Sequence, residues 1–142
     1  RPPRSTLFPY TTLFRSLAFS VKLSEEGGKE LARDLIALEG WKRRVDAVFC
    51  GNDILAIAAI DALREEGVEV GRDLSLIGMD DIPEAARTMP PLTTVRKPRH
   101  EIGTAAAELL LARIDDPERP AERRLFPGLL KIRGSVAERH HS

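Results

Sequence analysis

The sequence predicts an α/β fold in which helices flank a largely parallel sheet. Short apolar runs of strand type alternate along the chain with stretches whose apolar residues recur at helical spacing. The clearest unit spans residues 45–81. There an apolar run ends at Gly51, an alanine-rich helix follows directly, and Gly67 separates that helix from a second short strand ending at Gly78. This order of strand, helix and strand is one βαβ unit of a parallel sheet.

The remaining elements follow from the same two periodicities. Apolar and polar residues alternate over 17–22, which predicts a strand there. Ser24, followed by two acidic residues, is a suitable N-cap for a helix that ends near residue 37. Residues 40–44 form a polar connector, in which we expect Trp41 to be a partly exposed packing residue. Further on we expect a short helix at 82–89, a strand at 92–95, a helix at 102–114 with Ile102, Ala106, Leu109, Leu110 and Ile114 on one side, and a strand at 129–132.

Polar side chains follow two of these strands at the point where each strand ends. Asn52 and Asp53 come after the first strand of the βαβ unit, and Asp80 and Asp81 come after the second. Ligands of open parallel sheets bind beyond the carboxyl ends of the strands. A carboxylate there can accept hydrogen bonds from two neighbouring hydroxyls of a sugar or a nucleoside-like ligand. Asp53 is therefore the leading candidate for ligand binding, and Asn52, which offers both donor and acceptor, is the second.

These residues also have structural alternatives. The Asn52–Asp53 pair could instead cap the helix that follows, and one residue can do both. We expect Asp80 and Asp81 to organise the loop and the rim of a cleft, with direct ligand contact as the alternative. Two carboxylates at strand ends could also act as an acid and base pair, as in glycoside hydrolysis.

Other sequence features argue against catalysis. No histidine lies near either strand end, and the sequence has no nucleophile elbow, no phosphate-binding glycine loop and no metal-ligand spacing. The adjacent His140 and His141 near the end of the chain make a poor metal site. We therefore expect no catalytic residue, no cofactor and no metal.

Composition narrows the class of protein further. The 142 residues carry no formal net charge and are 42% hydrophobic, as in an ordinary soluble domain. The sequence lacks the excess of basic residues that would indicate a nucleic-acid-binding surface. The single cysteine, Cys50, lies in an apolar run, which fits a buried, inert thiol in a reducing cytoplasm. No apolar run approaches the roughly 20 residues of a membrane span, and no signal peptide is evident. We expect a cytoplasmic protein with no membrane partner.

Four motifs in order give the chain a family resemblance. FCGND at 49–53, LREEGVEVGRDLSLIGMDD at 63–81, PPLTTVRKP at 90–98 and LLKIRGSV at 129–136 resemble the effector-binding core of the LacI/GalR family of bacterial transcription regulators. The resemblance covers the chain after residue 17. It implies a periplasmic binding protein-like fold that is incomplete here and consists mostly of the C-terminal subdomain.

The resemblance also implies a function and its residues. The chain would bind a small-molecule effector, expected to be a sugar, through Asp53, and form a homodimer through the helix that carries Leu55, Ala59 and Ala62. It would reach operator DNA only through an N-terminal domain missing from this fragment. Leu23 aligns with a position where family members often carry an aromatic ring that stacks on the sugar. Because leucine offers no such platform, the effector's identity stays open.

The same resemblance predicts the domain organisation. Residues 17–91 would form the C-terminal effector-binding subdomain, 92–124 a crossover strand and helix of the N-terminal subdomain, and 125–142 a returning strand and tail. Within the crossover strand, the predicted hinge consists of Leu92, Thr93, Thr94 and Val95. Residues 1–16 resemble a translated sequencing adapter, and we exclude them as non-native.

Two other hypotheses remain open. A fragment of a periplasmic sugar-binding protein of an ABC transporter would share this fold, and a signal peptide upstream would decide for it. A free-standing dimerisation module is a third class. The pairing of the PPLTTV and GMDD motifs favours the regulator.

Overall fold

A computed structural model describes residues 17–137 of the chain. The proposed adapter segment at 1–16 and the pair His140–His141 lie outside the described residues. The elements in chain order are α1 (Glu25–Ala37), α2 (Trp41–Arg44), β1 (Ala47–Phe49), α3 (Asp53–Glu65), β2 (Ser75–Met79), the 3-10 helix η1 (Pro83–Ala86), β3 (Thr93–Arg96), α4 (Arg99–Asp115) and β4 (Leu129–Lys131).

The four strands form one mostly parallel sheet in the order β1-β2-β3-β4. The β1–β2 and β2–β3 pairs are parallel, whereas β4 runs antiparallel to β3, with Val95 opposite Leu130. The α/β prediction and the βαβ unit built from β1, α3 and β2 are therefore confirmed.

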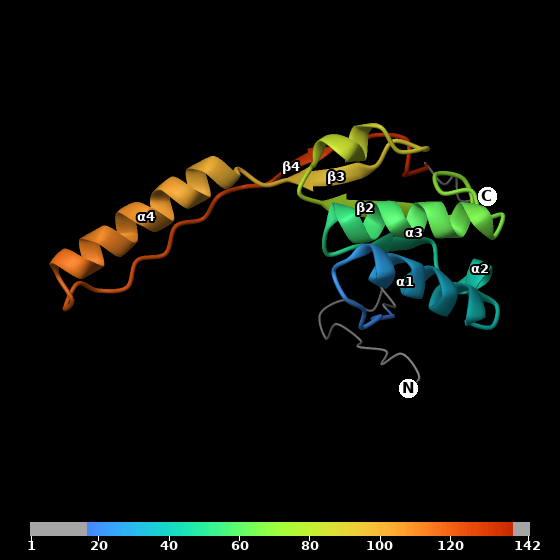
Figure 1. Cartoon of the computed structure of the whole chain (residues 1–142), viewed down its shortest axis with the longest axis horizontal. Coiled ribbons are helices and arrows are strands. Elements are labelled where there is room, and N and C mark those ends of the chain that lie inside the picture. The colour runs from blue at the N-terminus through green and yellow to red at the C-terminus, as the bar shows by residue number, and fades with distance from the viewer. Residues whose placement is uncertain (1–16, 138–142) are drawn as a thin grey trace.

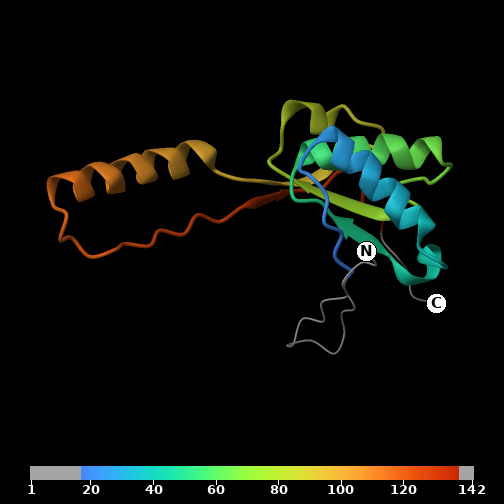
Figure 2. The ribbon, with the colours of Figure 1, turned by 60° about the horizontal axis from the view of Figure 1, so that its bottom comes forward.

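Helices α1 and α3 cover one face of the sheet (Figures 1 and 2). Ser24 caps α1 as expected, accepting a hydrogen bond from the Gly27 amide at 3.3 Å. The two helices approach closely because Gly28 has no side chain, since a Cβ there would lie 2.5 Å from the Leu55 carbonyl oxygen. Leu35, Ile60 and Leu76, all at most 1% exposed, lie in the core of this layer.

The N-terminal strand prediction was wrong. Residues 17–22 form no strand, although Leu17, Phe19 and Val21 pack against the hydrophobic core. The alternation of apolar residues is therefore used for packing, because no described strand pairs with this segment. The expectation for Trp41 was also wrong: the connector folds into α2 and the indole is only 7% exposed.

Helix α4 lies away from the sheet, joined to it by two extended segments that follow β3 and precede β4 (Figure 1). Ala105 is its one buried residue. Its predicted apolar side is largely uncovered, with Leu110 62% and Ile114 64% exposed. The helix itself was correctly predicted, but no other described element supplies the surface that its apolar residues would pack against.

Candidate functional site at the carboxyl edge of the sheet

The predicted polar residues meet at one edge of the sheet. Asp53, at the start of α3, accepts a hydrogen bond from the Ile82 amide at 2.9 Å, just beyond β2. The hydroxyl of Thr94 in β3 donates to the other Asp53 oxygen at 2.6 Å. The ends of β1 and β2 and the middle of β3 are thus connected through one side chain, as the parallel order of the strands requires.

Asp53 itself is fully buried. Its carboxyl lies directly against Gly78 of β2, where a Cβ would come within 2.3 Å of Oδ1. With both oxygens engaged and no exposed surface, the carboxyl is closed to a ligand in this arrangement. The aspartate that we expected at the surface of the site instead holds β3 and the loop after β2 against α3.

The sequence allowed either Asn52 or Asp53 to cap the helix, and in the structure Asn52 does so. Its Oδ1 accepts from the Leu55 amide at 2.9 Å, so Asn52 is the N-cap and Asp53 the first helical residue. Its Nδ2 donates to the Leu23 carbonyl at 3.3 Å. The Leu23 side chain lies over Gly51 and is 61% exposed. Leu23 and Asn52 therefore form an accessible part of the edge.

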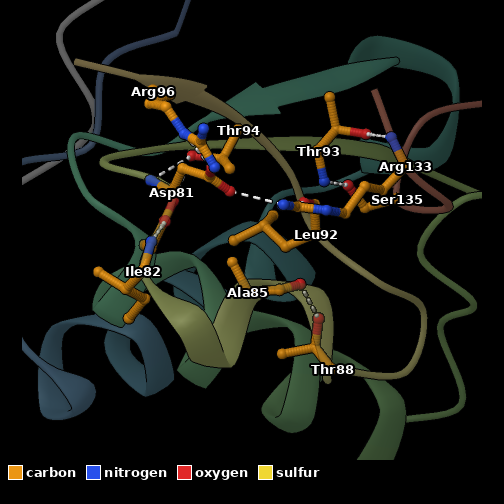
Figure 3. Close-up of polar contacts among 11 residues, drawn as sticks. Asp81, Ile82, Ala85, Thr88, Leu92, Thr93, Thr94, Arg96, Arg133 and Ser135 are labelled. Atoms are coloured by element: carbon orange, nitrogen blue, oxygen red, sulfur yellow. Dashed lines mark hydrogen bonds and ion pairs between the residues drawn. The ribbon is translucent and has the colours of Figure 1, made fainter. Parts of the chain in front are cut away.

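Asp80 and Asp81 organise the rim through ion pairs. Asp81 accepts from Arg96 on one oxygen and from Arg133 on the other, both at 2.6 Å (Figure 3). Asp80 pairs with Lys97 at 2.6 Å. Burial would raise the pKa of Asp81, but the hydrogen bonds and charges of Arg133 and Arg96 outweigh it and hold that pKa below its ordinary value.

The backbone at these two aspartates has positive φ angles, 122° at Asp80 and 55° at Asp81. Such angles are uncommon for residues with a side chain, and aspartate tolerates them better than most. The strained turn directs the Asp81 carboxylate toward Arg96 of β3 and Arg133 past β4, and the Asp80 carboxylate toward Lys97, just after β3.

The sequence prediction missed four residues of this site: Arg96, Lys97, Arg133 and Ser135. Arg133 also donates to the Leu92 carbonyl at 2.7 Å. The buried Ser135 hydroxyl donates to the Leu76 carbonyl at 2.6 Å and accepts from the Thr93 amide at 2.8 Å. The sequence offered one indication of the arginines, because two adjacent acids at a strand end are expected to have basic partners. The two arginines lie 15 and 52 residues after Asp81, and only the fold brings them to it.

Three of the four predicted hinge residues lie in β3, and Leu92 directly precedes this strand. Leu92, Thr93 and Thr94 are at most 1% exposed, and β3 pairs with β2 on one side and β4 on the other. Bending within β3 would disturb both pairings. The hinge stays a prediction, as does the domain boundary at residue 92, which lies directly before β3.

Two of the three predicted dimer residues are buried within this chain, and the dimer contact itself stays a prediction. Leu55 and Ala59 are 2% and 0% exposed and pack in the core beneath α3, so they face no partner. Ala62 is half-buried. A groove runs along the outer side of α3, lined by Glu25, Lys29, Ile54, Ile57, Ala58, Asp61, Ala62, Glu65, Ile82 and Glu84.

Cys50 lies at the end of β1, buried as predicted. Burial, with a smaller contribution from the charge of nearby Asp53, raises the pKa of the thiol to about 12. A thiol in this environment stays protonated and unreactive at neutral pH.

Among residues 17–137 no group of histidine, cysteine, aspartate or glutamate side chains is arranged to hold a metal ion. Within the same range no helix is both long and apolar enough to cross a membrane.

With this geometry in view, comparison with known proteins identifies the family. A profile for the periplasmic binding protein-like domain matches residues 13–136. The chain belongs to this family. Curated relatives of this periplasmic binding protein-like domain include the HTH-type transcriptional regulator MalR of Streptomyces coelicolor, 43% identical over 112 residues, which cover 79% of the chain and 31% of MalR.

Solved structures agree with this assignment. A LacI family transcriptional regulator from Enterococcus faecium with bound ribose superposes with a TM-score of 0.68 at 33% identity, covering 82% of this chain and 42% of that one. The transcriptional regulator CelR in complex with cellobiose gives 0.71 at 30% identity, covering 81% and 34%. The predicted membership of the LacI/GalR effector-binding domains is confirmed.

These relatives are much longer than the matched region. The chain spans about a third of the length of the curated regulators, with 31% of MalR covered. They are transcription regulators and not enzymes, and they favour the regulator over the transport hypothesis.

Proposed function

We propose that this chain is the effector-binding and dimerisation part of a LacI/GalR-type transcription regulator. The observation that carries the proposal is the polar rim at the carboxyl ends of β1 and β2, which lies beside the strand that continues toward α4. Similar regulators are described with ribose or cellobiose bound. A rim of this chemistry suits a ligand rich in hydroxyl groups.

The proposed effector is a sugar or a related small molecule. Leu23, 61% exposed, would contact the apolar face of the ring, while Asn52 and Asp80 would bond its hydroxyls at the rim. Asp53 and Asp81 would hold the rim from beneath. A direct bond from Asp53 to the effector requires the loop at 80–82 to move away from α3.

The proposed mechanism is a shift between two arrangements of the domain. Residues that pack on the sheet belong to one subdomain, and α4 belongs to the other. An effector that binds the closed arrangement better than the open one shifts the balance toward closure. In a dimeric parent protein this would alter the spacing of DNA-binding heads on operator DNA in the cytoplasm. The DNA-binding heads would belong to a domain preceding this chain.

We locate the proposed homodimer contact on the outer side of α3. The apolar residues Ile54, Ile57 and Ala62 line the groove there, together with Glu25 and Glu65. A twofold pairing of two such faces would remove both apolar stripes from water. In the parent protein Ile57→Asp should therefore convert dimers into monomers in light scattering after size exclusion. The control Ile102→Asp, on α4, should leave the dimer intact.

We propose no enzymatic activity and no cofactor. The carboxylates that could serve as acid and base are each bonded to protein groups: Asp53 to Thr94, Asp81 to two arginines and Asp80 to Lys97. The alternative, a sugar-binding protein of an ABC transporter, would share the same rim.

Calorimetric titration of the parent protein with ribose, cellobiose and sucrose tests the effector site. We expect heat of binding with at least one of these sugars, and a loss of at least about tenfold in affinity for Leu23→Asp. The remote control Leu125→Asp, 76% exposed, should bind as the unaltered protein does. Binding that is unchanged by Leu23→Asp would place the effector elsewhere.

A further inference from the structure

Two extended segments connect the sheet with α4, and five charged residues tie the strands from which these segments extend, β3 and β4, to the end of β2. We call this group the carboxylate clamp; its members are Asp80, Asp81, Arg96, Lys97 and Arg133. Arg96 and Lys97 lie where the chain leaves the sheet at the end of β3. Arg133 lies just past β4, the strand by which the chain returns to the sheet after α4.

The inner part of the clamp is one carboxylate shared by two guanidinium groups. The Asp81 side chain is only 2% exposed, and its two oxygens bind separate arginines, Arg96 in β3 and Arg133 just past β4 (Figure 3). Arg133 is 19% exposed, so its pair with Asp81 is largely withdrawn from water and is screened little by salt. Asp81 therefore ties the end of β4 farther from α4 to the end of β3 that leads to α4.

Two of the three ion pairs of the clamp have an exposed basic member. The Arg96 side chain is 55% exposed and the Lys97 side chain 41%, and the pair of Lys97 with Asp80 lies directly before Pro98, beyond the last residue of β3. Pairs of this kind are weakened by salt and gain little from burial. The clamp is therefore firmest at the Arg133–Asp81 pair and opens more easily at Arg96 and Lys97.

The backbone gives a second, independent indication. Both aspartates hold left-handed φ angles, 122° and 55°, and strain of this type persists only where the surroundings impose it. The turn accepts this strain while presenting both carboxylates to the basic residues.

We propose that the carboxylate clamp positions β3 and β4, from which the two connecting segments extend, and sets how readily these segments bend between the subdomains. Asp81 is a positioning residue that acts through Arg96 and Arg133 and touches no effector. The inference rests on the proposed function in one respect, that α4 belongs to a second subdomain. The pairing of the segments can be measured without any effector, so a failed search for a ligand leaves this test intact.

Hydrogen exchange of the full chain, followed by mass spectrometry or NMR, tests the clamp. Asp81→Asn should speed exchange of the β3–β4 amides about tenfold, the factor expected for the loss of a hydrogen bond to a charged group. Exchange of the β1–β2 amides should stay the same. Asp61→Asn is the matched control, because it removes an exposed ion pair with Arg64 on α3, and it should alter neither set.

A second variant distinguishes a local effect on the clamp from a general loss of stability. Asp80→Gly suits the left-handed backbone and releases only Lys97, so it should speed exchange near residues 97–99 by a smaller factor. Equal acceleration of both strand pairs in Asp81→Asn would mean a general loss of stability and would overturn the proposal. No acceleration at β3–β4 in either variant would overturn it as well.

Discussion

The substitution Asp53→Asn should destabilise the fold far more than an ordinary change of one oxygen to nitrogen. Asp53 is fully buried, with Thr94 donating to one oxygen and the Ile82 amide donating to the other. In asparagine one of these oxygens becomes an NH₂ group, which cannot accept. One donor therefore loses its partner, and the other bond loses the charge of its acceptor.

The magnitude follows from the two bonds. Leaving a buried donor without a partner costs about 1–3 kcal/mol, and a hydrogen bond to a neutral acceptor is roughly half as strong as one to a charged acceptor. We therefore expect a loss of about 2–4 kcal/mol in the free energy of unfolding. Gly78 leaves no room for relaxation, because the carboxyl lies directly against its Cα.

Urea denaturation followed by tryptophan fluorescence provides the assay. Trp41 is the one tryptophan of the chain and is buried in the same core, so its emission reports unfolding. Asp61→Asn, on the exposed side of the same helix, is the control and should change stability by less than about 0.5 kcal/mol. Equal midpoints for the two variants would refute the burial of Asp53 and the anchoring of β3 described above.

Three further predictions concern the same edge. Leu23→Trp should strengthen binding of a pyranose sugar severalfold by supplying a stacking ring, whereas Leu125→Trp should not; equal calorimetric affinities for both variants would argue against Leu23 as a contact. The Cys50 thiol, with its pKa raised to about 12, should react with Ellman's reagent at pH 8 only after urea is added, and rapid labelling without urea would contradict its burial. Because the folded pKa of Asp81 lies below its ordinary value of 3.8, its ion pairs should contribute their full stability above about pH 5 and lose it as the pH falls through the folded pKa. The difference in unfolding free energy between the unaltered chain and Asp81→Asn should accordingly stay constant from pH 7 to 5 and shrink below pH 4; a difference that grows in acid would be contrary to this sign.

The central βαβ unit could be predicted from the sequence because its signals are local. The Ser24 cap, the helical spacing after Asn52 and the Gly67 terminus each depend on a few neighbouring residues. The convergence of Asp53 and Asp80 at one edge then followed from the parallel order of the strands.

Properties that depend on distant partners could not be predicted in this way. Whether Asp53 faces a ligand or the core depends on Thr94, 41 residues along the chain. The bases that pair with Asp81 come from two different strands. In α3 apolar residues lie on more than one side of the helix, and only the packing on α1 decides that Leu55 faces inward and Ile57 outward.

Recovery of the natural reading frame upstream of Leu17 from the source DNA tests the central claim most directly. For an effector-binding part of a LacI/GalR-type regulator, the upstream sequence should encode a helix-turn-helix followed by the first half of a sugar-binding domain, with residues 1–16 absent. A secretory signal peptide ahead of the binding domain would contradict the regulator and support transport.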